Sequence, residues 1–151
     1  MKQFRFSLEK VLKFRQFSEQ EAKNELGRAI SVLNAIENDI KRNALIHSQA
    51  ARERFTGINA DDNNAVSASV GALSMLAWDN YILRLEQEAQ RLMEEAAQAE
   101  LVVEEKRALY LEASRELKVM ENLKEKRRQE YRKEVFAAET SELDDMWRDK
   151  R

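Results

Sequence analysis

Residues 75–138 read MLAWDNYILRLEQEAQRLMEEAAQAELVVEEKRALYLEASRELKVMENLKEKRRQEYRKEVFAA, and one helical face recurs in them every three, then four, residues. Fifteen of the nineteen positions on that face are apolar, and three of the four exceptions follow Met120. The positions are Met75, Trp78, Ile82, Leu85, Ala89, Leu92, Ala96, Ala99, Val103, Lys106, Tyr110, Ala113, Leu117, Met120, Lys124, Arg127, Tyr131, Glu134 and Ala138. A spacing of about 3.5 residues keeps one stripe of side chains against a partner helix, so this stretch predicts the seam of a coiled coil.

A second, shorter seam precedes it, and nine of its thirteen positions are apolar. The positions are Leu8, Leu12, Arg15, Glu19, Ala22, Leu26, Ala29, Leu33, Ile36, Ile40, Asn43, His47 and Ala50. Asparagines and aspartates gather between the two seams, at residues 59–64, and such side chains favour turns. Two seams with one short connection predict an antiparallel helical hairpin.

We therefore expect an all-α fold in a single domain, residues 1–151, built as a long two-helix antiparallel coiled-coil hairpin. Helix 1 is expected at about 7–55, the connection at about 56–70, helix 2 at about 71–140 and an acidic tail at about 141–151. If Phe55 lies opposite about residue 72, paired residue numbers sum to roughly 127. Helix 1 then runs out near residue 123, so helix 2 is the longer helix and overhangs at its C-terminal end without an intramolecular partner.

The composition agrees with uninterrupted helices. Charged residues make up 36% of the chain, there is no proline and there are three glycines. No run of alternating β-branched residues predicts a strand. Cysteine is absent, which excludes disulfides and thiolate metal sites and fits a reducing cytosol. We expect neither a membrane span nor a signal peptide, because no apolar run is long enough and the first residues lack an apolar core.

The net charge of −2 conceals strong local charge. Residues 1–15 carry a net +4, residues 86–105 a net −6 and residues 115–133 a net +4. The hairpin brings the two basic segments to the same end, where an acidic partner would supply the counter-charge. Because Glu121, Glu125 and Glu130 interrupt the second basic segment, we expect an acidic protein surface there and no nucleic acid.

The chain offers no set of residues for catalysis. His47 is the only histidine, so neither an ordinary zinc site nor a Ser-His-Asp set is available. No glycine-rich phosphate loop occurs either. We predict no catalytic residue, no cofactor and no metal, and we interpret His47, at a seam position one turn after Asn43, as structural.

Exposed aromatic residues are the other candidates for binding. On the predicted register, Phe14 and Phe17 point away from the seam. Either a local register shift or fraying packs them on the overhanging helix, or they form an aromatic patch that anchors a partner beside basic side chains. Near the other terminus, Leu143, Met146 and Trp147 share one helical face, which is either a short docking element or a frayed helix end.

Three short segments carry a resemblance to a known family. Residues 4–15 follow the pattern Phe-x-Phe-x-Leu-x-x-Val-Leu-x-x-Arg, residues 78–86 form an aromatic-rich start to helix 2, and residues 141–145 form an acidic terminus. In these features the chain resembles the FliJ family of flagellar type III export proteins, over nearly its whole length. The N-terminal pattern is the most specific of the three.

The resemblance implies a non-enzymatic component of the flagellar type III export apparatus. Such proteins act as a central stalk within the hexameric export ATPase, contact the cytosolic domain of the export gate protein and handle empty export chaperones. They are cytoplasmic and reach the cytoplasmic face of the inner membrane only through the export complex.

Carried onto this sequence, the resemblance implies three sets of binding residues. The export-gate strip on helix 2 is Tyr81, Leu85, Glu88 and Leu92, in which Glu88 stands where a small residue is expected. The ATPase-ring residues are Arg5, Lys10, Lys13, Arg15, Lys124, Arg127 and Arg128. The possible partner-binding aromatics are Phe14, Phe17 and Trp147. Two alternatives stay open at this point: the stalk of a virulence-type secretion system, and a self-associating structural coiled coil.

Overall fold

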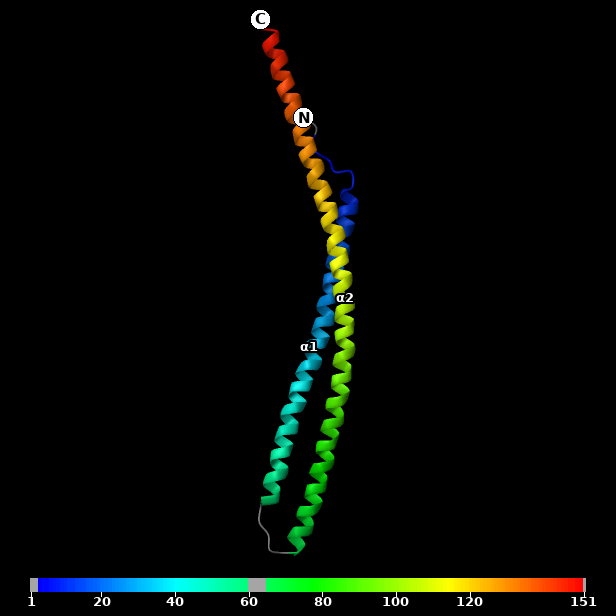
Figure 1. Ribbon diagram of the computed structural model, residues 1–151, viewed down its shortest axis with the longest axis vertical. Coiled ribbons are helices and arrows are strands. Elements are labelled where there is room, and N and C mark those ends of the chain that lie inside the picture. The colour runs from blue at the N-terminus through cyan, green and yellow to red at the C-terminus, as the bar shows by residue number, and fades with distance from the viewer. Residues whose placement is uncertain (1–2, 60–64, 151) are drawn as a thin grey trace. The chain divides into compact units, whose positions relative to one another are not determined.

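The computed structural model describes residues 3–59 and 65–150, with side-chain surroundings for 3–56 and 71–150. It contains two helices, α1 (Glu9–Asn59) and α2 (Ala65–Arg148), which lie side by side in Figure 1. Over the described ranges there is no strand. α2 has 84 residues and α1 has 51, so the prediction of an all-α hairpin with a longer second helix is confirmed.

The helix bounds differ from the predicted ones at every end. α1 begins two residues later than expected and extends to Asn59, while α2 begins at Ala65 and continues through most of the predicted tail to Arg148. The polar residues that predicted a connection of about 56–70 do not stop the helices at those limits, because no proline interrupts them. The predicted turn residues 60–64 lie outside the described residues.

The chain divides into two compact units, and each contains a length of α1 and a length of α2. Unit 1 consists of Met1–Glu25 and Lys106–Arg151, and unit 2 of Leu26–Glu105. The two basic segments found in the sequence therefore fall in unit 1, and the acidic segment 86–105 falls in unit 2.

In unit 2 the two helices run antiparallel. Arg54 Nε lies 2.6 Å from Asp79 Oδ1, and His47 Nε2 lies 3.4 Å from Glu86 Oε1. The earlier of the two α1 residues thus contacts the later of the two α2 residues, as antiparallel helices require. Between the helices, Ala50, Leu92 and Val103 are buried. This narrow core is typical of a two-helix coiled coil, which covers only one stripe of each helix.

Unit 1 is antiparallel as well, and ion pairs join its helices. Lys106 Nζ lies 3.8 Å from Glu25, Lys124 Nζ lies 2.9 Å from Glu9, and Arg15 contacts Glu116. The residue numbers of the cross-helix pairs in both units sum to 131 or 133. The predicted sum of roughly 127 is therefore wrong by about one helical turn.

The predicted seam positions are correct over most of both helices. From Leu12 to Ala50 on α1, and from Met75 to Lys124 on α2, every one of them is buried or half-buried. Leu8 is 40% exposed. Beyond Lys124 the pattern fails, because Arg127, Glu134 and Ala138 are exposed while Tyr131 is half-buried.

The failure coincides with the start of α1 at Glu9. Preceding it, residues 3–8 are not helical, and the ring of Phe4 lies 5.6 Å from the ring of Tyr131, tilted by 44°. The expectation that helix 2 lacks a partner from about residue 124 onward is thus wrong, since Glu9 and Phe4 contact it up to Tyr131. Every described residue from Phe136 to Lys150 is exposed, so the overhang begins one helical turn beyond Tyr131.

Candidate functional site: charged and aromatic surfaces

The residues predicted for ring binding all lie in unit 1. Arg5, Lys10, Lys13, Arg127 and Arg128 are exposed. Arg15 and Lys124 are half-buried at seam positions and pair with Glu116 and Glu9 across the helices. Arg127 also lies 3.5 Å from Glu130 on its own helix. We call these seven residues (Arg5, Lys10, Lys13, Arg15, Lys124, Arg127 and Arg128) the basic surface; its exposed members are available to a partner and its paired members join α1 to α2.

The predicted aromatic residues are exposed. Phe14 is 62% and Phe17 is 63% exposed, whereas Leu12 between the helices is 3% exposed. This excludes the alternative that a register shift or fraying packs the two phenylalanines on α2. Lys10 and Lys13 are exposed on the same side of α1, since Lys10 lies four residues before Phe14 and Lys13 four residues before Phe17. Trp147 is 73% exposed and lies in the last turn of α2.

The sequence reasoning missed the packing of the N-terminal segment on α2. Phe4 and Phe6 are half-buried. Two grooves flank the Phe4–Tyr131 contact, of about 390 and 590 Å³. The first is lined on α2 by Val135 and Phe136, and the second by Arg127 and Glu134. The only signal in the sequence was that Tyr131 keeps an aromatic side chain on the seam where the neighbouring positions have become charged.

The predicted export-gate strip is only partly on the surface. Tyr81 is 40% exposed, Glu88 and Leu85 are half-buried, and Leu92 is 5% exposed at the seam with α1. Leu85 and Leu92 therefore pack within unit 2, and Tyr81 and Glu88 flank that packing. The four residues do not form one continuous exposed strip.

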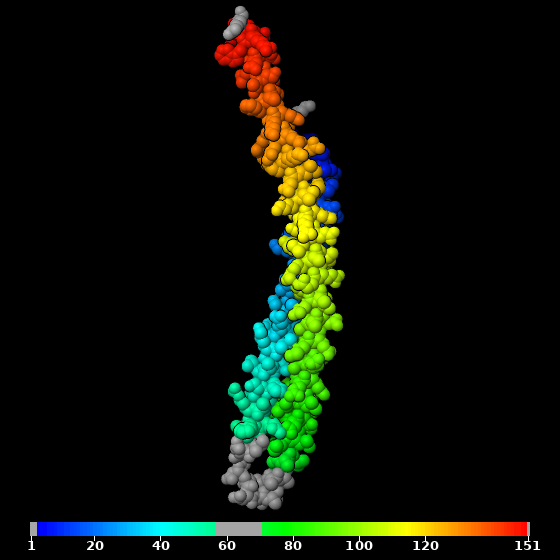
Figure 2. All heavy atoms as spheres, in the orientation of Figure 1, coloured from blue at the N-terminus to red at the C-terminus, as the bar shows by residue number. Residues whose placement is uncertain are grey.

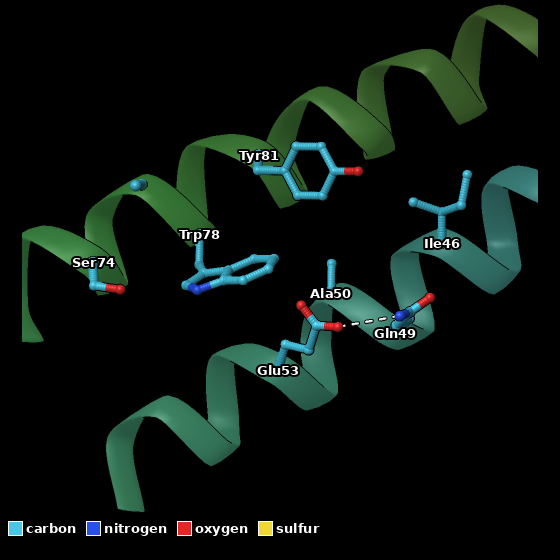
Figure 3. A pocket seen from close by; sticks show the side chains of 8 residues that line it. Ile46, Gln49, Ala50, Glu53, Ser74, Trp78 and Tyr81 are labelled. Atoms are coloured by element: carbon cyan, nitrogen blue, oxygen red, sulfur yellow. Dashed lines mark hydrogen bonds between the residues drawn. The ribbon is translucent and has the colours of Figure 1, made fainter. Parts of the chain in front are cut away.

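Tyr81 borders a groove between the two helices of unit 2, of about 500 Å³. Figure 3 shows Trp78 and Tyr81 of α2 on one side of it and Ile46 and Ala50 of α1 on the other. The two aromatic rings meet edge to face, 6.0 Å apart. We call this feature the Trp78 groove; it combines apolar walls with the polar Gln49 and Glu53 at its rim, as partner-binding grooves commonly do.

Glu88 takes part in an ion-pair cluster along α2. Arg91 Nε donates to Glu88 Oε2 at 2.9 Å, and Arg91 also contacts Glu95. The hydrogen bond from Arg91 lowers the pKa of Glu88 below the usual 4.5; burial opposes this shift, and the positive charge of Arg91 adds to it. The same hydrogen bond and the two carboxylates raise the pKa of Arg91. A charged Glu88 thus fills the position where a small residue was expected.

Neither metal ligation nor a membrane span is indicated by the part of the chain that the structure describes. Its His, Asp and Glu side chains form no group of three or more that is arranged to hold a metal ion. His47 is half-buried at the seam and contacts Glu86, as a structural residue would. Within the described ranges, neither helix contains a stretch long and apolar enough to cross a bilayer.

Comparison with known proteins gives one finding. Residues 4–148 match the family model described as the flagellar FliJ protein. Among curated proteins and among solved structures nothing matches. The family match extends from the packed N-terminal segment to the last turn of α2, so it includes both units.

Proposed function

Since the chain belongs to the FliJ family of flagellar proteins, we propose that it is a non-enzymatic component of the flagellar type III export apparatus and acts as the central stalk of the export ATPase ring. The observation that carries the proposal is the gathering of the basic surface, from α1 and α2 together, in one compact unit. Exposed Lys10 and Lys13 beside Phe14 and Phe17 have the composition of a partner-binding surface, with cations at the edge and aromatic anchors.

The stalk acts through asymmetry. A two-helix element presents different side chains in each direction, whereas the six subunits of a ring start out equivalent. A subunit that meets Lys10 and Lys13 binds more tightly in one conformation than a subunit that meets another side of the stalk. Such differential binding shifts the conformational equilibrium of one subunit at a time, and it requires no catalytic residue in the stalk.

Contact with the cytosolic domain of the export gate protein is assigned to unit 2. Tyr81 is the exposed member of the predicted strip and borders the Trp78 groove, while half-buried Leu85 and buried Leu92 support it by packing within unit 2. Edge-to-face aromatic pairs such as Trp78–Tyr81 offer a large apolar area at low cost in side-chain entropy. The gate therefore binds a surface separate in sequence and unit from the basic surface.

The remaining parts of the proposal rest on family membership. They are contact with empty export chaperones and a cytoplasmic location, at the inner face of the inner membrane through the export complex. The family match is flagellar, which favours the flagellar system over a virulence-type one.

A steady-state ATPase assay with the cognate export ATPase tests the stalk. We expect the full chain to stimulate hydrolysis, and K10E/K13E/R128E to reduce the stimulation at least about tenfold, since like charges then oppose the ring. The matched control K41E/R52E/R84E reverses three exposed cations of unit 2 and keeps full stimulation. No stimulation by the wild-type chain, or equal loss in both variants, contradicts the proposal.

Binding to the isolated cytosolic domain of the gate protein tests the second surface. Y81A removes the exposed ring of the Trp78 groove, so we expect it to weaken binding by about tenfold or more. L101A removes a side chain that is 71% exposed elsewhere in unit 2 and is the control. Equal affinity of Y81A and wild type would place the gate contact elsewhere.

A further inference from the structure

The last part of α2 carries two blocks of opposite charge. Residues 124–133 contain six basic and two acidic side chains, a net charge of +4. Residues 134–149 contain six acidic and one basic, a net charge of −5. The sign changes between Lys133 and Glu134, so one helix presents a basic half followed directly by an acidic half.

The acidic half also has an apolar stripe. Phe136, Leu143 and Trp147 are separated by seven and four residues, so they share one face of α2. They are 71%, 56% and 73% exposed. On the face shown in Figure 2, no other described segment lies beside the red end of the chain. Phe136, at the start of the stripe, borders the groove at Phe4. Large apolar side chains on a helix without tertiary packing usually mark an interface, since such a helix gains little from propensity alone.

We propose that a second copy of this chain covers this stripe, with residues 119–148 of the two copies antiparallel about a two-fold axis. In an antiparallel pair, the basic half of each copy lies opposite the acidic half of the other copy, so two attractive contacts form. In a parallel pair, halves of like charge lie opposite each other. With the axis near Lys133 and Glu134, Leu143 of one copy comes near Leu123 of the other, and Trp147 comes near Val119. Val119 is itself 65% exposed on the side away from the seam.

This inference goes beyond the stalk proposal and does not rest on it. Arg127 and Arg128 belong to both the basic surface and the basic half, so the second copy and the ATPase ring compete for them. The pair is closed by its two-fold axis, and it therefore differs from the filament that a self-associating structural coiled coil would form.

Sedimentation equilibrium of the full chain tests the pairing directly. From low to high micromolar concentration, the mass is expected to rise from 17.7 kDa to twice that value and no further. Salt at about 0.5 M is expected to weaken the pair, because the attraction between exposed charge blocks is screened. A mass of 17.7 kDa at every concentration, or growth beyond two copies, overturns the proposal.

Charge reversal tests the arrangement. E139K/E142K/D145K makes both halves basic, and R127E/R128E/R132E makes both acidic. Each variant alone is expected to stay monomeric, while an equimolar mixture of the two forms a heterodimer. The control E94K/E100K/E105K reverses as many acids in unit 2 and is expected to pair like the wild type. Circular dichroism checks that each variant stays helical. Pairing by either variant alone, or no pairing in the mixture, overturns the proposal.

Discussion

The two compact units use the same pair of helices in different ways. In unit 2 the seam is almost entirely apolar, with Leu92 and Val103 buried, and its charged side chains form ion pairs mainly at the edges. In unit 1 charged residues enter the seam itself, where Lys124 pairs with Glu9 and Arg15 with Glu116. Apolar packing at the seam stabilises unit 2. Unit 1 has less of this packing, and its charged side chains instead form a surface that can recognise a charged partner.

Deleting an apolar seam residue of unit 2 is expected to have the largest effect on stability. Leu92 is 5% exposed between the helices. L92A removes buried methyl groups and leaves a gap, so we expect a loss of about 3 kcal/mol in the free energy of unfolding. Urea denaturation followed by helical circular dichroism measures it.

The control for this prediction is L101A, at a position 71% exposed on the same helix. It should change stability by less than about 0.5 kcal/mol. If the two substitutions cost the same, apolar packing at the seam is not what holds unit 2.

The next largest effect on stability is expected at Asn43, a polar residue in the apolar seam of unit 2. It is 8% exposed at a seam position, where a polar side chain fixes pairing at the expense of stability. N43L is expected to raise the free energy of unfolding by about 1 kcal/mol, because an apolar side chain packs better there. The exposed Asn38, changed to leucine, should leave it unchanged. A lower free energy of unfolding in N43L would mean that the interactions of the Asn43 amide stabilise the fold by more than the burial of that amide destabilises it.

The sequence predicted the seam well and the end of the molecule poorly. Periodicity alone identified the buried face from Leu12 to Ala50 and from Met75 to Lys124, because the same positions face the partner helix in every repeat of a coiled coil. It failed at Arg127 and Glu134, where the partner is no longer a helix. Residues 3–8 have no helical period, and the contact of Phe4 with Tyr131 depends on where a non-helical segment happens to run.

The sequence pattern also could not predict which residues of the two helices lie opposite each other. Two seams with the same spacing fit together equally well when shifted by a turn, so the connection and the ion pairs decide the register. The export-gate strip came from the family resemblance and conflicted with the seam pattern. That pattern places Leu85 and Leu92 at seam positions and Tyr81 off the seam, and in the structure Leu92 is buried while Tyr81 is 40% exposed.

Cross-helix ion pairs of unit 1 are expected to contribute less than a seam leucine. Lys124 and Glu9 are 2.9 Å apart, with side chains 37% and 41% exposed. A double-mutant cycle of E9Q and K124Q should give a coupling below about 1 kcal/mol, since solvent screens the pair. The coupling should fall further at high salt, whereas the loss in L92A should not. A coupling as large as the L92A effect would show that charge, not apolar packing, holds unit 1 together.

The smallest expected effect is the titration of Glu88, where a charge pair lies along one helix of unit 2. The hydrogen bond from Arg91 lowers the pKa of Glu88 below 4.5 in the folded chain. A carboxylate with a lowered folded pKa stabilises the fold above its unfolded pKa, and this contribution is lost as the pH falls through the folded value. NMR titration of the side chain should therefore give a midpoint below 4.5 in the wild type and a return toward 4.5 in R91A. Because Glu88, Arg91 and Glu95 lie on one helix, R91A should leave the pairing of α1 with α2 intact, in contrast to the cross-helix pairs of unit 1. An unchanged midpoint in R91A would mean that Glu88 owes its lowered pKa to a different neighbour and that charge in unit 2 is not organised along α2.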